Sequence, residues 1–109
     1  MTGLTCHVLD LALGQPARGL TVRLDLHEAA GWRVLTTAVT DGDGRTGELA
    51  APLAPGTYRL AFDSGAYFAA TGRPSFYPYI EVTFQVTAPG KHHVPLLLSP
   101  YGYSTYRGS

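Results

Sequence analysis

The sequence has one cysteine, Cys6, and little charge, with eight basic residues balancing eight acidic ones. A single cysteine cannot form an internal disulfide, and it suits a reducing compartment. Without a basic stripe, nucleic acid is not an expected partner. No apolar run approaches the roughly 20 residues of a transmembrane helix, and the first residues do not resemble a signal peptide. We therefore expect a cytoplasmic protein with no membrane partner.

The length and composition favour one small β domain. A chain of 109 residues can bury a single core, so we expect one domain over residues 1–109. Tyrosine, glycine and proline are abundant, which favours short strands joined by turns. A small sandwich with so little charge can also carry an uncharged outer patch, which commonly indicates self-association.

Alternating apolar and polar residues predict seven or eight strands, and hence an all-β antiparallel sandwich. The row that includes Asp25 is expected to face outward, and Gly14 to Pro16 are expected to turn. The predicted strands cover residues 4–10, 21–28, 32–40, 56–62, 79–86, 93–99 and 101–106, with a very short edge strand at 45–46 and a loop over 47–55.

The period changes once, after residue 62. Asp63 and Ser64 can cap a helix, residues 66–70 tolerate helical conformation, and Gly72 with Pro74 ends it. We expect a single short helix of about two turns.

The last seventeen residues, His93 to Ser109, carry the strongest functional signal. They begin as a strand whose alternate faces are apolar and histidine-bearing, break at Ser99-Pro100 and continue as an aromatic strand. Most domains end in a frayed segment. This chain ends in a strand and the polar tetrapeptide Tyr-Arg-Gly-Ser, which suggests a terminus held in place for use.

Four motifs resemble the 5-hydroxyisourate hydrolases, the enzyme branch of the transthyretin family. Leu-Leu-Ser-Pro-Tyr-x-Tyr-Ser-Thr is shared with the carrier transthyretin, whereas the terminal Tyr-Arg-Gly-Ser belongs to the hydrolases. The motifs are Leu-Thr-x-His-Val-Leu-Asp at 4–10, Asp-Gly-Arg at 43–45, His-Val-Pro-Leu-Leu-Leu-Ser-Pro at 93–100 and Tyr-Arg-Gly-Ser at 106–109.

The resemblance implies an activity, an assembly and a set of site residues. The activity is hydrolysis of 5-hydroxyisourate to 2-oxo-4-hydroxy-4-carboxy-5-ureidoimidazoline in urate breakdown, without cofactor or metal. The assembly is a homotetramer, a dimer of dimers with sites where the dimers meet. The implied catalytic residues are His7, Arg45 and His93, and the implied substrate-binding residues are Arg45, Tyr106, Arg107, Gly108 and Ser109.

From the residues alone, the same side chains have simpler interpretations. His7 and His93 would be solvated strand histidines, and Arg45 an exposed charge after a glycine-rich turn. His92 must point away from His93 along a strand, which indicates a structural or accessory role, and His27 is expected to be solvated.

Other motif matches are weaker. Residues 42–47 fit G-x-G-x-x-G, but Pro52 and Pro55 leave no room for the helix that a dinucleotide fold needs. Asp41 and Asp43 lack the further ligands of a calcium loop, and His92 and His93 alternate, so a metal site is not expected. Two other functions stay open: a transthyretin-like carrier of a small apolar ligand, and an interaction module without a pocket.

Overall fold

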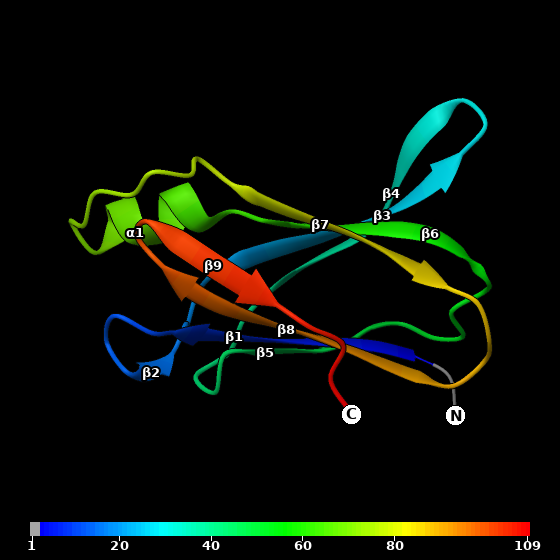
Figure 1. Cartoon of the computed structure of the whole chain (residues 1–109), viewed down its shortest axis with the longest axis horizontal. Helices are drawn as coiled ribbons and strands as arrows, with labels where there is room; N and C mark the ends of the chain where they lie inside the picture. Colours follow the sequence, from blue (N-terminus) through cyan, green and yellow to red (C-terminus); the bar gives the residue numbers. More distant parts are fainter. Residues whose placement is uncertain (1–2) are drawn as a thin grey trace.

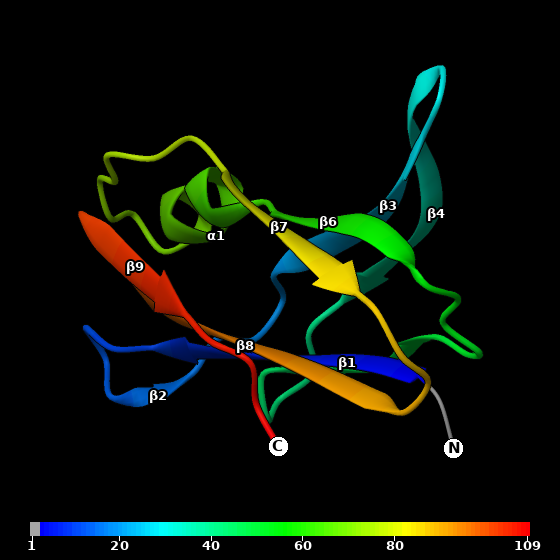
Figure 2. The ribbon, with the colours of Figure 1, turned by 45° about the vertical axis from the view of Figure 1, so that its right-hand side comes forward.

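The computed structural model describes residues 3–109, which form nine strands and one helix arranged in two layers (Figures 1 and 2). The elements in chain order are β1 (Gly3–Asp10), β2 (Gln15–Pro16), β3 (Thr21–Glu28), β4 (Gly31–Val39), β5 (Arg45–Ala50), β6 (Gly56–Phe62), α1 (Ser64–Ala70), β7 (Ile80–Val86), β8 (Lys91–Ser99) and β9 (Gly102–Thr105).

The strands form two sheets. One has the order β2-β1-β8-β9, with β5 also paired to β1, and the other has the order β4-β3-β6-β7. Every pair is antiparallel except β1 and β8, which run parallel. The predicted antiparallel sandwich with one short helix is therefore confirmed, and the parallel pair is a feature that the residue pattern did not indicate.

The core lies between the sheets, because each strand turns its apolar row inward. In β1, β6 and β8 the inward row consists of alternate residues along the strand. Their buried members are Leu4, Cys6 and Val8 of β1, Tyr58, Leu60 and Phe62 of β6, and Val94, Leu96 and Leu98 of β8.

Two segments have a different secondary structure from the one predicted. Gln15 and Pro16 form a short strand against the end of β1 rather than a turn. The edge strand that starts at Arg45 runs to Ala50, so much of the loop predicted over 47–55 is strand. Gly47 lies within this strand at a φ of 70°. This left-handed conformation permits a bulge, which interrupts the regular alternation of side chains along the strand.

Asp25 belongs to the outward row of β3, as predicted, yet it is fully buried. Two arginines cover it: Arg23 Nε lies 2.8 Å from one carboxylate oxygen and Arg59 Nε 2.9 Å from the other. Burial alone would raise the pKa of Asp25, but the hydrogen bonds and charges of these arginines outweigh it and lower the pKa.

The predicted helix is confirmed as α1. The Asp63 side chain makes no capping hydrogen bond, whereas the predicted stop holds, because Gly72 adopts a φ of 69° just beyond the helix. Across residues 3–109, no helix has the length and apolar character needed to span a membrane.

A buried ionic cluster ties the helical region to the end of β1. Asp10 is fully buried and accepts hydrogen bonds from Arg73 Nη2 at 2.7 Å and from the Tyr67 hydroxyl at 2.7 Å. The backbone N–H of Leu13 donates a third at 3.1 Å. Burial by itself raises the pKa of Asp10, but these bonds and the charge of Arg73 more than compensate, and the pKa lies below its usual value.

Candidate active site

Three of the predicted site residues, His7, Arg45 and His93, lie on the outer face of the sheet that contains β1 and β8. In the parallel β1–β8 pair, Thr5 lies opposite His93, and in the antiparallel β1–β5 pair, His7 lies opposite Arg45. Thr5 and His7 are two residues apart and share one face of β1, opposite the buried Leu4, Cys6 and Val8. Three segments distant in sequence thus present their polar side chains side by side, because adjacent strands lie about 5 Å apart.

An irregular β5 puts Arg45 in register with His7. Thr5 pairs with Glu48 and His7 pairs with Arg45, so three residues of β5 span two of β1. Such a bulge re-aims the side chains that follow it. The extra residue falls near Gly47, whose positive φ accommodates it. A regular ladder starting from the same Thr5–Glu48 pair would have placed Thr46 opposite His7.

The turn before Arg45 is fastened to β1. The N–H of Val8 donates to the carbonyl of Gly44 at 2.8 Å, and a Cβ on Gly44 would lie 2.4 Å from the carbonyl oxygen of Val8. Gly44 also has a φ of 75°, so both space and backbone conformation require glycine here. Asp41 closes the turn by accepting from the N–H groups of Asp43 and Arg45.

His93 is half-buried and its side chain makes one hydrogen bond. Its Nδ1 lies 2.7 Å from the Thr5 hydroxyl oxygen. Burial lowers the pKa of His93, the charges of Arg45 and His7 lower it further, and a hydrogen bond to the backbone of Thr5 partly opposes them. The net effect is a lowered pKa, so the His93 imidazole is neutral near neutral pH. A neutral imidazole has a free lone pair and can accept a proton.

His7 is also oriented by the turn. Its Nε2 lies 2.9 Å from the backbone carbonyl oxygen of Asp43. A carbonyl can only accept, so Nε2 carries a proton and donates it. In the neutral imidazole the remaining lone pair is then on Nδ1. His7 is thus held through its Nε2, whereas His93 is held through its Nδ1.

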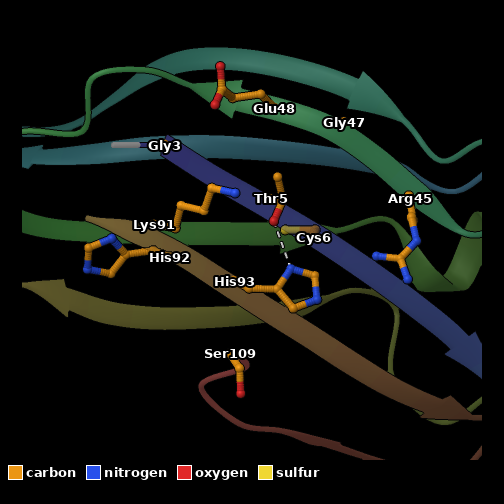
Figure 3. A pocket seen from close by; sticks show the side chains of 10 residues that line it. All are labelled: Gly3, Thr5, Cys6, Arg45, Gly47, Glu48, Lys91, His92, His93 and Ser109. Atoms are coloured by element: carbon orange, nitrogen blue, oxygen red, sulfur yellow. Dashed lines mark hydrogen bonds between the residues drawn. The ribbon is translucent and has the colours of Figure 1, made fainter. Parts of the chain in front are cut away.

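An open cleft of about 380 Å³ lies on this face (Figure 3). Arg45 stands on one side of His93 and Lys91 on the other, while Ser109 approaches from the last segment of the chain. The cleft is lined by Gly3, Thr5, Cys6, Arg45, Gly47, Glu48, Lys91, His92, His93 and Ser109.

The last residues of the chain return to His93. The N–H of Gly108 donates to the backbone carbonyl of His93 at 2.8 Å, as an isolated antiparallel bridge. A Cβ on Gly108 would lie 2.6 Å from Cδ2 of His93, so glycine is what lets the segment lie against the imidazole. Tyr106 and Arg107 line a neighbouring groove of about 280 Å³ against β7. His93 lines both this groove and the cleft, whereas Arg45 lines the cleft alone.

Arg45, His93 and Ser109 line the cleft and were predicted as site residues, whereas the polar residues Thr5, Glu48 and Lys91 also line it and were not predicted. Thr5 was detectable, because it lies two residues before His7 in the same motif and so on the same face. No sequence pattern indicated Lys91 or Glu48 as site residues, because their positions depend on the strand pairing and on the bulge of β5. His7 lies beside the cleft rather than among its lining residues.

The other two histidines lie as expected. His92 is buried, and its Nδ1 lies 3.0 Å from the carbonyl oxygen of Gly90 to which it donates, in agreement with a structural role. His27 is exposed on the other sheet, where its ring meets Trp32 edge-on at 5.0 Å.

No metal-binding group is evident in the described part of the chain. Within residues 3–109, no three histidine, cysteine, aspartate or glutamate side chains gather closely enough to hold an ion. The site instead offers two imidazoles and a guanidinium, which can exchange protons and bind an anion without a metal.

The two sheets, the short helix and a polar site on an outer sheet face define a transthyretin-like β-sandwich. The chain belongs to the HIUase/Transthyretin family, whose family model matches residues 4–108. It is 52% identical to a mouse 5-hydroxyisourate hydrolase, over 97% of this chain and 94% of that protein.

Solved structures agree with this assignment. The 5-hydroxyisourate hydrolase of Klebsiella pneumoniae superimposes with a TM-score of 0.89 at 38% identity, covering 100% of this chain and 94% of the other. Sea bream transthyretin in complex with thyroxine superimposes with a TM-score of 0.93 at 32% identity, covering 97% and 94%. The fold itself is therefore common to hydrolases and carriers, and the distinction between them depends on the site residues.

Proposed function

We propose that this protein hydrolyses 5-hydroxyisourate in urate breakdown. The observation that carries the proposal is the convergence of His7, Arg45 and His93 on one sheet face, with the last residues of the chain against His93. Relatives and a solved structure that cover almost the whole chain bear the name of this hydrolase. No cofactor is needed for the reaction that we propose.

The reaction adds water to a carbonyl carbon of the six-membered ring. Water loses a proton and its oxygen bonds to the carbonyl carbon, the ring C–N bond breaks, and the leaving nitrogen takes up a proton. A carboxylic acid and a ureido group result, and the acid releases its proton to solvent to become a carboxylate. His7 and His93 are the groups that exchange these protons. Arg45 donates to the flat, carbonyl-rich ring and stabilises the negative charge that develops on oxygen.

The tail residues complete the substrate site in this proposal. Ser109 lines the cleft with Arg45 and His93, where it can contact the ring directly. Gly108 holds the segment against His93. Tyr106 and Arg107 line the adjoining groove and would close the site from that side.

We also infer that the active form is a homotetramer, a dimer of dimers with sites at the dimer–dimer interface. Arg45, Tyr106, Arg107 and Ser109 are exposed in the single chain, and the cleft is open. Most ligand sites enclose the greater part of their ligand. Two-fold symmetry would bring two copies of the same face together and enclose this one.

Breaking this interface should abolish activity while the fold survives. Leu97 is half-buried on the same outer face, in register with Leu9 and Ser104. We expect Leu97→Glu to give a folded species smaller than a tetramer, with a ring-opening rate near the uncatalysed one, as measured by analytical ultracentrifugation and absorbance. Val34→Glu, on an exposed position of β4, is the matched control and should remain fully active. A dissociated variant that worked at the tetramer's rate would contradict the interface proposal.

The direct test of function is the decay of freshly made 5-hydroxyisourate, followed by ultraviolet absorbance with and without protein. We expect the intact protein to accelerate the decay strongly. Deleting Tyr106–Ser109 should return the rate close to the spontaneous one and leave the circular dichroism spectrum unchanged, because β9 ends at Thr105. An intact protein that left the spontaneous rate unchanged would end the proposal.

The same deletion separates the alternatives. A transthyretin-like carrier would bind an apolar ligand and tolerate the loss of its last four residues. An interaction module would show neither activity nor a shared site. A hydrolase alone should lose a catalytic function with its fold intact.

We infer that residues 1–109 work as one domain, because one buried apolar cluster joins both sheets over the described residues. We also infer a cytoplasmic location, which fits the free and buried Cys6, whose burial raises the pKa of its thiol to about 12. Cell fractionation would test the location.

A further inference from the structure

Thr5 lies against the nitrogen of His93 that turns away from Arg45. The hydroxyl oxygen is 2.7 Å from Nδ1, and the contact is partly buried. It arises from the parallel register of β1 and β8, which sets the two residues directly opposite each other. In Figure 3 the other ring nitrogen, Nε2, lies on the side of the ring that faces Arg45.

The direction of this hydrogen bond determines what His93 can do. A hydroxyl can donate to Nδ1, which places the ring proton on Nε2, or it can accept from Nδ1–H, which leaves a lone pair on Nε2. Arg45 lies on the Nε2 side of the ring, and its guanidinium is positively charged and has donors only, so it favours a lone pair over an N–H at Nε2. The surroundings therefore favour the proton on Nδ1.

A second contact keeps the ring in this orientation. Gly108 lies so close to the imidazole that an added Cβ would be 2.6 Å from Cδ2 and 3.2 Å from Cγ of His93. The bridge between Gly108 and His93 fixes that backbone beside the ring. With Thr5 on the Nδ1 side and Gly108 against the Cδ2 side, a half-turn of the ring, which would exchange Nδ1 with Cδ2 and Nε2 with Cε1, would require the tail to move.

We propose that Thr5 is a positioning residue that keeps the proton of neutral His93 on Nδ1 and so leaves Nε2 as the nitrogen that takes the proton from water. The catalytic part of this inference rests on the proposed hydrolysis, whereas the position of the ring proton does not. Thr5 itself touches neither water nor the ring of the substrate in this scheme. Its effect passes through His93.

The ring proton can be located in the unmodified protein. Imidazole ¹⁵N spectra, recorded at a pH where His93 is neutral, distinguish a nitrogen that carries a proton from one that does not. We expect His93 to be predominantly Nδ1–H in the wild-type protein. In Thr5→Val, which keeps the shape of the side chain but removes the hydroxyl, we expect a mixture of the two tautomers.

The kinetic consequence should appear in kcat. Removing a general base altogether costs about 10²- to 10⁴-fold, and a ring that is only part of the time in the right tautomer should lose a fraction of that. We expect Thr5→Val to lower kcat for ring opening in proportion to the loss of the Nδ1–H tautomer, about tenfold if that tautomer falls to roughly a tenth of the population, with KM changed less than about twofold. Thr5→Ser restores the hydroxyl and should restore most of kcat.

Thr57→Val serves as the matched control, since Thr57 lies on β6 of the other sheet. Circular dichroism and sedimentation check that each variant keeps its fold and assembly. A wild-type His93 that is mainly Nε2–H would overturn the proposal even if no variant folded. So would a folded Thr5→Val with wild-type kcat and an unchanged tautomer. If the wild-type protein left 5-hydroxyisourate untouched, the proposed function would fail while the spectra still decided the tautomer.

Discussion

His93→Asn is expected to lower kcat for ring opening by about 10²- to 10⁴-fold, the usual contribution of a positioned general base. Asparagine cannot accept a proton near neutral pH, so the loss should be in the chemical step. Because His93 is half-buried on an outer sheet face and makes one side-chain hydrogen bond, the free energy of unfolding should change by no more than about 1 kcal/mol. Steady-state rates and thermal unfolding measure the two effects.

His27→Asn is the matched control for this substitution. His27 is an exposed strand histidine of the other sheet, so the same chemical change there should leave kcat unaltered. Equal losses in the two variants would show that the effect of His93→Asn is not local. An active His93→Asn enzyme would remove His93 from the proposed mechanism.

Among single substitutions of partly exposed charged residues, Arg73→Met is expected to lower the free energy of unfolding most. It leaves the carboxylate of Asp10 fully buried without its cation. Breaking a buried pair in this way costs about 3–5 kcal/mol. The hydroxyl of Tyr67 and the N–H of Leu13 still donate to Asp10, so we expect a value near the lower end. Denaturant unfolding at a fixed protomer concentration measures it.

The control for this prediction is Arg33→Met. The Arg33–Glu28 pair has a similar separation, 3.0 Å, but both side chains are largely exposed, so its loss should cost at most about 1 kcal/mol. Comparable losses in the two variants would show that burial of Asp10 does not govern the effect.

The same cluster predicts a dependence of stability on pH. The folded pKa of Asp10 is lowered relative to its usual value, so its contribution is fully present above the unfolded pKa of about 3.9. It is lost as the pH falls through the folded pKa. Arg73→Met should therefore lose less stability than the wild-type protein between neutral pH and acid.

Much of the fold follows from local rules. Strict alternation in β1, β3, β6 and β8 identified both the strands and their inward rows, and the change of period after residue 62 identified α1. The length of β5 was underestimated because a bulge interrupts its alternation. The parallel pairing of β1 with β8 also stayed hidden, since strand direction is set by how distant segments pack rather than by their own residues.

The site was predictable to a different degree at each position. His7, Arg45 and His93 stood out through motifs, whereas their residue types and spacing alone would have indicated solvated side chains. Thr5 and Gly108 acquire their roles from pairing: the hydroxyl reaches Nδ1 of His93 across two parallel strands, and the glycine lies on the same ring. Thr5 and His93 are 88 residues apart in sequence, and no local pattern predicts such a contact.

The central claim is that His7 and His93 act together in one site, and a double-mutant cycle tests it most directly. The rates of 5-hydroxyisourate ring opening are compared for His7→Asn, His93→Asn and the double variant, each above the spontaneous decay. Groups that work as one unit lose their effect together, so we predict a double variant about as slow as the slower single one. Losses that multiplied would mean two independent contributions and would contradict the account.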